Sequence, residues 1–410
     1  MKFVPVSELL ELSDSGVWGE EDTNNGISVL RSTNFNANGT LDLGKLTFRV
    51  LADRDKDRKL LQPGDILLEK SGGGPKQPVG RVCLYTGDSQ PHAFGNFIAR
   101  LRPNSEILSA YLFYFLWNFH QTGKTSYYQK QTTGLRNLEL KRYLAINIPL
   151  PNIKEQRRIV DLLSRAEGII RLRREAQKKA SAIIPALFRD IFGDPLTNPK
   201  GWPVQALGDL IARGPTNGLY KHKSAYGSGT PILRIDAFYD GSVRDLSTLK
   251  RVRLEPDEQR RFALSEGDIV INRVNSPEYL GKSAIIPTLR EPSVFESNMM
   301  RFSVDDAYAL PEFVIALLQE PTSRRHFLAN AKHAINQSSI NQQDVKSLPA
   351  IAPPLHLQRL FVKLASAMQS IELQQQAALI RARQTFNSLL ARTFSAAAPE
   401  GSQAMEKALA

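Results

Sequence analysis

Short apolar runs between turn residues fill two long stretches of the chain, residues 1–150 and 196–350. Such runs are typical of strands, and apolar residues at helical spacing predict helices at 109–119 and 311–319. Both stretches are therefore expected to form mixed domains of short strands and a few helices. The clearest strand candidates are residues 64–68, 81–85, 268–272 and 283–286.

The pattern changes over residues 151–195 and 351–394, where Gly and Pro become rare and steps of four and three residues alternate. This spacing predicts two long helices that pair as an antiparallel coiled coil with polar layers in the middle. Pro185 predicts a bend between Ser181 and Pro185, because proline lacks an N–H. The predicted contact positions are Leu163, Ala166, Ile170, Arg173, Gln177, Ala180, Ile184, Leu187 and Ile191, and then Phe361, Leu364, Met368, Ile371, Gln375 and Ala378.

A repeat relates the two halves of the chain. Matching segments recur in one order at offsets of 201 to 204 positions, which chance similarity does not produce. The expected fold class is α+β, with two similar mixed domains, two long helices and a pseudo-two-fold internal repeat. The pairs include Val29-Leu30-Arg31 with Ile232-Leu233-Arg234, Gly64-Asp65-Ile66 with Gly267-Asp268-Ile269, Gln156-Arg157 with Gln358-Arg359, and Phe192 with Phe394.

Charge favours a polyanionic partner. Across 410 residues, 53 Lys and Arg face 41 Asp and Glu, giving a formal net charge of +12. The first helical stretch holds ten basic and five acidic residues from Lys154 to Phe192, and the second holds five and one from His356 to Phe394. Most of the net charge therefore lies on the two helices, and the two mixed domains must select a partner by individually placed side chains.

The remaining composition points to a cytoplasmic protein. Cys83 is the single cysteine, so an intramolecular disulfide or cysteine-based zinc cluster is excluded. The first 16 residues lack the features of a secretory signal, and no run of 18 apolar residues occurs. No membrane association is expected.

Catalytic motifs are missing from the pattern. A phosphate-binding loop requires a second glycine five positions before its Gly-Lys-Thr/Ser tripeptide. The tripeptides at 123–125 and 281–283 have Asn118 and Ser276 at that position instead. Asp65, Glu69 and Lys70 faintly resemble a nuclease cluster, but the repeat does not keep it, which favours a structural turn and strand. The adenine-methyltransferase motif is absent, and the six histidines show no metal-binding spacing. A triad assembled from distant residues stays open.

Binding is the better interpretation of the turn-rich regions, which mix cations, aromatic residues and amides. Lysine and arginine contact phosphates, and Asn and Gln suit adenine edges. The DNA-binding candidates are Lys70, Lys76, Lys124, Tyr127, Tyr128, Lys130, Gln131 and Arg136 in the first half, and Lys221, Lys223, Arg273, Asn275, Tyr279, Lys282, Lys332, Asn336 and Gln337 in the second.

These features together resemble the specificity subunit of type I restriction-modification enzymes. The similarity rests on Ile148-Pro149-Leu150-Pro151 followed by Lys154-Glu155-Gln156-Arg157-Arg158-Ile159, on a helix ending in Phe188-Arg189-Asp190-Ile191-Phe192-Gly193-Asp194-Pro195, and on Gly201-Trp202-Pro203 opening a second copy. Gly16-Val17-Trp18-Gly19-Glu20 and Leu30-Arg31-Ser32-Thr33-Asn34-Phe35 resemble the beginning of the family's target-recognition domains. The second copy lacks a counterpart of Glu155 before Gln358.

The resemblance implies target-recognition domains at 1–150 and 196–350, spacer helices at 151–195 and 351–394, and a flexible tail at 395–410. Each domain would recognise one half of a split double-stranded DNA sequence, while the helices set the separation and dock two methyltransferase subunits. Restriction/translocase subunits would complete the assembly. The chain itself would have no catalytic activity, metal or cofactor; S-adenosylmethionine, ATP and Mg²⁺ would belong to the partner subunits.

Two other classes remain open at this point. A stand-alone nuclease or methyltransferase would need a catalytic site that the sequence does not display. A coiled-coil scaffold that binds proteins but not DNA would use only the helices.

Overall fold

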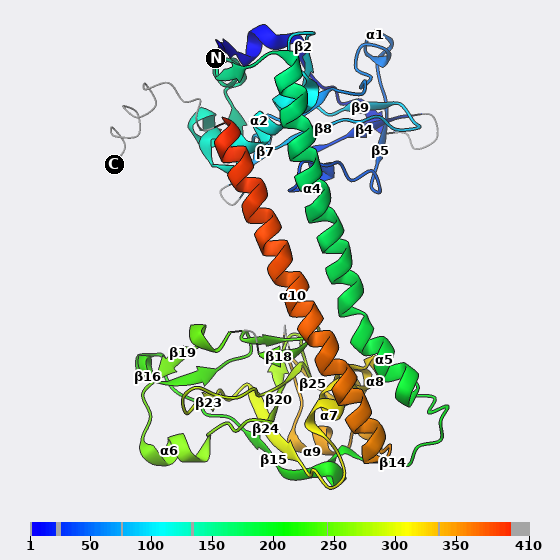
Figure 1. Ribbon diagram of the computed structural model, residues 1–410, viewed down its shortest axis with the longest axis vertical. Coiled ribbons are helices and arrows are strands. Elements are labelled where there is room, and N and C mark those ends of the chain that lie inside the picture. The colour runs from blue at the N-terminus through cyan, green and yellow to red at the C-terminus, as the bar shows by residue number, and fades with distance from the viewer. Residues whose placement is uncertain are drawn as a thin grey trace. The chain divides into compact units, whose positions relative to one another are not determined.

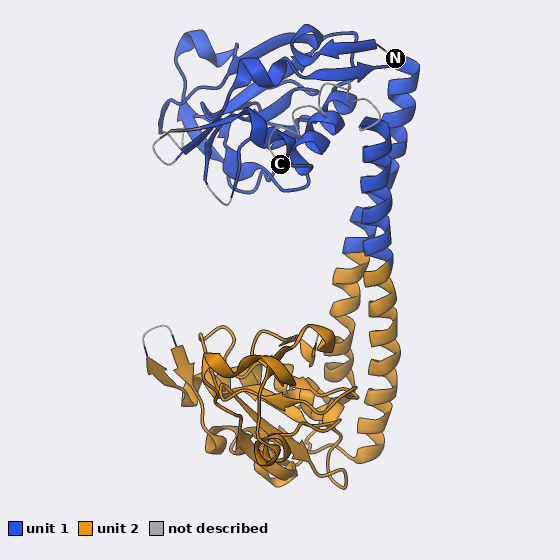
Figure 2. Cartoon of the chain, turned by 90° about the vertical axis from the view of Figure 1, so that its left-hand side faces the viewer, with its two compact units in different colours: residues 1–174, 378–410 blue, residues 175–377 orange. Residues whose placement is uncertain are grey.

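The computed structural model describes residues 2–21, 26–74, 77–132, 135–243, 245–334 and 337–394. The predicted tail 395–410, Lys76, Asn336 and the side chain of Gln131 lie outside the described residues. The chain forms two compact units, drawn in two colours in Figure 2. Unit 1 comprises residues 1–174 and 378–410, and unit 2 comprises residues 175–377.

Unit 1 is built around an antiparallel sheet in the order β2-β10-β6-β8, against which helix α2 packs. A second sheet, β3-β5-β4-β9, a three-stranded sheet, β11-β12-β7, and the pair β1-β13 complete it. The strands are β1 (Lys2–Pro5), β2 (Leu10–Ser15), β3 (Glu20–Glu21), β4 (Ile27–Leu30), β5 (Thr47–Val50), β6 (Ile66–Glu69), β7 (Ser71–Gly73), β8 (Val82–Leu84), β9 (His92–Phe94), β10 (Ile98–Pro103), β11 (Gln129–Thr132), β12 (Leu135–Leu138) and β13 (Asn147–Leu150). The short helices are α1 (Asp53–Lys56), α2 (Ser109–Gln121) and α3 (Leu140–Leu144).

Unit 2 repeats these pairings. Its main sheet has the order β15-β24-β20-β22-β18-β17, beside β19-β16-β23, β21-β26-β25 and the pair β14-β27. The strands are β14 (Val204–Ala206), β15 (Ile211–Asn217), β16 (Tyr226–Leu233), β17 (Phe238–Tyr239), β18 (Gly241–Val243), β19 (Lys250–Val252), β20 (Ile269–Asn272), β21 (Val274–Asn275), β22 (Ser283–Ile285), β23 (Val294–Phe295), β24 (Met299–Val304), β25 (Lys332–Ala334), β26 (Gln337–Ser339) and β27 (Pro349–Ile351). The helices are α6 (Pro256–Arg261), α7 (Pro311–Gln319), α8 (Pro321–Asn330) and α9 (Gln342–Lys346).

The duplication therefore extends to strand register. In unit 1, Leu67 of β6 pairs with Arg100 of β10, and in unit 2, Val270 of β20 pairs with Arg301 of β24. In both units one parallel pairing joins the second sheet, β4 with β9 and β16 with β23. The predicted α+β class and internal repeat are confirmed, and unit 2 adds β17, β18 and α8.

Two long helical segments belong to both units. Helix α4 (Ile153–Ser181) continues into α5 (Ile183–Phe192), and α10 spans Leu355–Phe394 (Figure 1). The helix is interrupted at Ala182, within the predicted bend. Pro185 causes this interruption because it has no N–H to donate to the carbonyl of Ser181. The start of α4 lies in unit 1 with the end of α10, so the paired segments run antiparallel there.

The helix contact positions differ in part from those predicted. In α10, Leu364 and Ile371 are 37% and 42% exposed, whereas Ala365, next to Leu364, and Leu379, next to the predicted Ala378, are buried in hydrophobic clusters. The predicted positions Leu364 and Ile371 are therefore wrong. Apolar residues at steps of three and four positions occur on two adjacent faces of α10. Tertiary packing buries the face that contains Ala365.

A similar shift occurs in α5. Phe188 and Phe192 are the buried residues of this helix, and the predicted Leu187 and Ile191 are only partly buried. The interruption at Ala182 rotates the helical phase, so the pattern of α4 does not continue through it.

The mixed domain of each unit packs on helix segments from both halves of the chain. In unit 2, the ring of Phe313 on α7 lies 5.8 Å from Phe188 and 5.0 Å from Phe192 of α5. Phe361 of α10 lies 5.7 Å from Phe188. In unit 1, Phe386 near the end of α10 contacts Tyr114 and Trp117 of α2. The end of each helical segment thus completes the core of the domain formed by the other half.

The repeated glutamines fasten each long helix to its own domain. Gln156 is fully buried; its Oε1 accepts from the Leu108 N–H at 2.8 Å, and its Nε2 donates to the carbonyls of Glu106 and Pro151. Gln358 is equally buried and makes the matching bonds to Leu310, Tyr308 and Pro353. This shared hydrogen-bond pattern gives the Gln-Arg repeat a structural reason.

Candidate nucleic-acid interface

The three-stranded sheet β11-β12-β7, here called hairpin sheet 1, gathers most of the DNA-binding candidates of unit 1. Strand β11 carries Lys130 and Gln131, and Arg136 lies opposite Gln131 on β12. The 3₁₀ turn Lys124–Tyr128 leads directly into β11, and Lys70 precedes β7. Residues that were 60 positions apart in sequence therefore meet on one small sheet, because β12 pairs with both β11 and β7.

The side chains of hairpin sheet 1 differ in availability. Lys124 is exposed and Tyr127 is 51% exposed. Tyr128 instead packs between Phe119 and Tyr143, with ring centroids 5.8 and 5.9 Å apart, so most of its contacts are structural. Burial lowers the pKa of Lys70.

Lys130 has an exposed side chain, 76% accessible, and forms an ion pair with Glu139 at 2.5 Å. An exposed pair of this kind contributes little to stability. A phosphate can therefore replace the carboxylate at small cost.

Replacing Lys130 by Ala should leave the fold intact and lower the salt dependence of DNA binding by about one unit in log K against log salt. The slope should fall because the variant makes one phosphate contact fewer and therefore releases fewer counterions from the DNA on binding. Titrations of the full chain with duplex DNA at several salt concentrations measure this slope. An unchanged slope would remove Lys130 from the interface.

The corresponding sheet in unit 2, β21-β26-β25, is called hairpin sheet 2. Lys332 on β25 pairs with Ser339 of β26, and Gln337 on β26 is exposed. Asn275 lies on β21, opposite Ser338. The same strand order in both units brings the candidates of each half to an equivalent position, which local sequence similarity alone did not indicate.

Three other candidates of unit 2 make contacts within the fold. The ammonium of Lys282 donates to the Ile235 carbonyl at 2.6 Å and lies 3.8 Å from the ring centroid of Tyr239. Arg273 donates to the Ser297 carbonyl at 3.2 Å, and Tyr279 is 45% exposed beside Lys282. Aromatic rings stabilise a cation near their faces, so Lys282 has a structural role here.

Lys221 and Lys223 lie away from hairpin sheet 2, at an open hollow beside β16 and β19. Three further cations line this hollow, Arg234, Lys250 and Arg251, which were not among the predicted site residues. Lys250 and Arg251 lie on β19, and the pairing of β19 with β16 brings them to the strand that Arg234 follows. The one signal in the sequence was the basic run Lys250-Arg251-Val252-Arg253.

The carboxylates that resembled a nuclease cluster have structural partners. Glu69 is buried and accepts two hydrogen bonds from Arg81, at 2.7 and 2.8 Å. Asp65 is buried and accepts two from Arg102 at the same distances. Within the described ranges, no group of three or more His, Cys, Asp or Glu could hold a metal ion. The preferred interpretation of a structural turn and strand agrees with these contacts.

Ser28, His92 and Asp88 form a serine–histidine–aspartate arrangement that the sequence did not reveal. His92 shares a hydrogen bond with the Ser28 hydroxyl, and its Nε2 lies 2.8 Å from Asp88 Oδ2. Ser28 and His92 are 2% and 0% exposed, and they face each other across the parallel pair β4-β9. A nucleophile must be accessible to its substrate, and the buried Ser28 is not. The hydrogen bonds of this arrangement therefore stabilise the pairing of β4 with β9. Cys83 is also buried, and burial raises the pKa of its thiol to about 12.

The Asp88 contact predicts an acid-sensitive contribution to stability. The hydrogen bond with His92 holds the pKa of Asp88 below its ordinary value of 3.8. A carboxyl with a lowered pKa stabilises the fold above its ordinary pKa, and this contribution is lost as the pH falls through the lower, folded-state pKa. Asp88→Asn should therefore be less stable than the wild type at pH 7, with the difference shrinking below about pH 4. Urea denaturation at several pH values measures it, and a constant difference down to pH 2 would contradict it.

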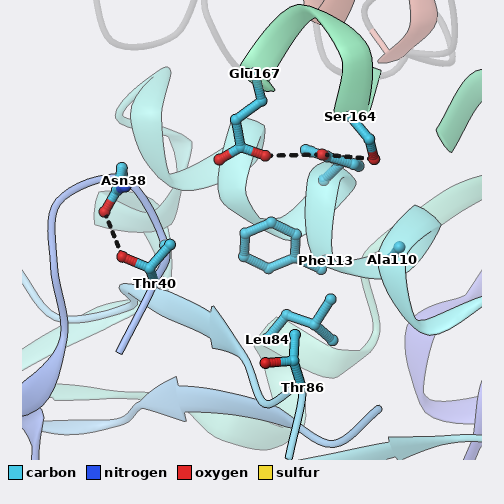
Figure 3. A pocket seen from close by; sticks show the side chains of 10 residues that line it. Asn38, Thr40, Leu84, Thr86, Ala110, Phe113, Ser164 and Glu167 are labelled. Atoms are coloured by element: carbon cyan, nitrogen blue, oxygen red, sulfur yellow. Dashed lines mark hydrogen bonds between the residues drawn. The ribbon is translucent and has the colours of Figure 1, made fainter. Parts of the chain in front are cut away.

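A small cavity in unit 1 lies where α2, α4 and the loop around Gly39 meet (Figure 3). Its volume is about 170 Å³, below the range of about 300–1,000 Å³ usual for small-molecule sites. At its edge the Tyr114 hydroxyl donates to Glu167 Oε2 at 2.9 Å and shares a hydrogen bond with Ser164. These bonds join α4 to the domain, so the cavity belongs to a structural junction.

The geometry defines a class of protein: a duplicated binding protein with two equivalent hairpin sheets rich in cations and amides. Residues 2–181 match the family model described as the type I restriction modification DNA specificity domain. The chain is 26% identical over 393 residues to the StySPI specificity subunit of Salmonella potsdam, covering 90% of this chain and 81% of that one. It is 25% identical over 390 residues to the EcoKI specificity subunit of Escherichia coli K12, covering 90% and 82%.

Solved structures share the fold. A chain from a study of "complex assembly and conformational transition of the type I R-M system" superposes with a TM-score of 0.59 at 16% identity, covering 96% of this chain and 97% of that one. The type I restriction-modification S subunit of M. genitalium superposes with a TM-score of 0.53 at 14% identity, covering 96% of both chains.

Residues 2–181 thus match the DNA specificity domain of type I restriction-modification systems, and the chain is similar over 90% of its length to specificity subunits of these systems. These matches confirm the resemblance predicted from the sequence. Among the described helices, none is long and apolar enough to cross a membrane.

Proposed function

We propose that this chain recognises a bipartite DNA target, one half through each recognition domain. The observation that carries the proposal is the recurrence of the same three-stranded hairpin sheet in both units, with cations and amides on each. The two copies share strand order but differ in side chains: Lys130 and Arg136 are on one sheet, Lys332 and Gln337 on the other. Different base-contacting residues on one scaffold suit two different half-sites.

The long helices carry apolar residues that intrachain packing does not use. On α10, Leu360, Leu364 and Ile371 are 45%, 37% and 42% exposed. Their spacings of four and seven residues place them on one face of the helix. In unit 1, Leu162 and Ile169 of α4 are 48% and 51% exposed at a spacing of seven. Exposed apolar stripes on charged helices favour docking of partner helices, and we assign these two stripes to methyltransferase subunits.

Replacing Leu364 and Ile371 together by Glu should weaken capture of the methyltransferase subunit by about 30-fold or more, since two apolar contacts are lost and two charges are introduced. The free energy of unfolding should change little, because both residues are exposed in the free chain. Titration calorimetry or pull-down with purified methyltransferase subunit measures the effect. Glu substitutions at Ser366 and Ser370, also exposed on α10, provide the control. Equal loss in both pairs would contradict the assigned stripe.

In this proposal the chain is a non-catalytic adaptor in the cytoplasm. The partner methyltransferase holds S-adenosylmethionine, and the restriction/translocase subunit holds ATP and Mg²⁺. Two observations support a non-catalytic role for this chain: Ser28 and His92 are buried, and Glu69 is paired with Arg81 within the fold.

Mapping of methylated bases in DNA from cells that express the chain with its methyltransferase subunit tests the proposal. The expected result is one motif of two defined half-sites separated by undefined bases. Exchange of residues 1–150 for those of another specificity subunit should change one half-site only. A motif without a gap, or changes in both halves, would overturn it. DNA cleavage or methylation by the chain alone would favour a stand-alone enzyme, and absence of DNA binding with and without the partner would favour a protein scaffold.

A further inference from the structure

An open, strongly basic hollow lies in unit 2, beside the pair β16-β19. Its volume is about 870 Å³. No acidic residue, Asn or Gln is among the residues that line it. The hollow therefore offers charge without the amide groups that distinguish bases. The side chains that matter are Lys221, Lys223, Tyr226, Arg234, Lys250 and Arg251.

Two of the five cations are uncompensated. Lys223 and Lys250 are exposed, and the described part of the chain offers their side chains neither an ion pair nor a hydrogen bond. The other three cations each contact one carboxylate outside the lining: Lys221 with Glu258 at 2.8 Å, Arg234 with Glu296 at 3.2 Å, and Arg251 with Glu291 at 2.5 Å. The hollow thus keeps a net positive charge, because only three carboxylates pair with its five cations.

The internal repeat supplies a comparison at the same place in unit 1. The Val17 N–H donates to the Phe94 carbonyl at 2.9 Å, and the Leu219 N–H donates to the Phe295 carbonyl at 2.9 Å. Because Phe94 and Phe295 occupy equivalent positions on β9 and β23, Val17 corresponds to Leu219. Counting forward from this anchor, Lys221 and Lys223 correspond to Gly19 and Glu21.

Strand register extends the comparison to the other wall. Thr47 pairs with Val29 in unit 1, and Lys250 pairs with Ile232 in unit 2. Lys250 therefore corresponds to Thr47. At these three positions the first domain carries Gly19, Glu21 and Thr47, whereas the second carries lysine; Arg234 has a basic counterpart in Arg31. The three lysines of the hollow are thus a particular property of the second domain, since the fold itself does not require their charges.

We propose that this hollow binds the phosphate backbone of duplex DNA and adds sequence-independent affinity to the second recognition domain. The inference rests on the proposed function and names a second contact surface besides hairpin sheet 2. Lysine is a flexible point charge that suits phosphates, and duplex DNA presents closely spaced phosphates along each strand. An open hollow with several separated cations fits such a series of charges.

The test uses the full chain with a labelled random-sequence duplex of about 30 base pairs, titrated by anisotropy at several salt concentrations. Lys223→Gln/Lys250→Gln should lower the slope of log K against log salt by about 2, since each lost phosphate contact contributes about 0.9. The matched Lys223→Arg/Lys250→Arg variant keeps both charges and should retain the wild-type slope. The methylated motif should be the same for all three proteins, because the hollow does not select bases.

A wild-type slope in the Gln variant, with its melting temperature unchanged, would overturn the inference while leaving the proposed function intact. A changed methylation motif would also overturn it, because the hollow would then select sequence. Failure of the wild-type chain to bind DNA, alone or with the methyltransferase subunit, would instead overturn the proposed function.

Discussion

Phe188→Ala should lower the free energy of unfolding by about 3 to 5 kcal/mol, the usual cost of removing a buried phenylalanine ring. Phe188 is 1% exposed, and three aromatic rings lie within 5.8 Å of its centroid: Phe192, Phe313 and Phe361. These rings come from α5, α7 and α10. The cavity left by alanine would therefore weaken the junction between the helices and the second recognition domain. Chemical denaturation followed by circular dichroism measures the change.

Leu187→Ala is the matched control for this prediction. Leu187 precedes Phe188 on the same helix and is partly buried, so its truncation should cost clearly less, about 1 to 2 kcal/mol. A larger cost at Leu187 than at Phe188 would show that the phase predicted from spacing is the correct one. It would contradict the assignment of Phe188 to the core.

Gln358→Leu should be the second strongly destabilising change, by about 2 to 5 kcal/mol. The substitution removes the acceptor of the Leu310 N–H and the donor to the carbonyls of Tyr308 and Pro353. Each buried polar group left without a partner costs about 1 to 3 kcal/mol. Leucine is similar in size to glutamine, so little of the effect should arise from a cavity. Thermal and chemical unfolding of the full chain measure it.

The internal repeat provides a comparison within the same chain. Gln156→Leu should have an effect of similar size, because Gln156 makes the same three bonds to Leu108, Glu106 and Pro151. The exposed neighbours Arg157 and Arg359 serve as controls, and Arg→Ala at either should change stability by less than about 0.5 kcal/mol. Equal effects of the Arg and Gln substitutions would mean that the buried hydrogen bonds are not what fastens the helices.

The repeat was the strongest prediction from sequence alone. Fixed offsets between Gly64-Asp65 and Gly267-Asp268 predicted two copies of one domain, and the structure confirms equivalent pairings of β6 and β20. Helices α2 and α7 begin where apolar spacing placed them, at Ser109 and Pro311. These features are local or repeated, so the chain itself displays them.

The DNA-contacting residues that were predicted in unit 1 stay predictions, but the structure shows why they were hard to group. Lys70 and Arg136 are far apart in sequence and are brought to the same small sheet because β12 pairs with β7, which Lys70 immediately precedes. Lys250 was not predicted as a site residue, because Lys221 and Lys223, which line the same hollow, lie before β16 whereas Lys250 lies on β19. Nonlocal strand pairing decides such groupings, and side-chain type alone does not reveal it.

By itself the sequence determined the duplication, the order of mixed domains and long helices, and the absence of familiar catalytic motifs, because each is recorded in spacing or residue type along the chain. The tertiary structure alone decided which of two adjacent apolar faces of α10 is buried, which helix end completes which domain, and where the basic hollow lies. Periodicity limits which residues can share a face. The choice between two such faces depends on the close-packed surface against which the helix lies: Ala365 is buried in the core of unit 2, whereas its neighbour Leu364 is 37% exposed.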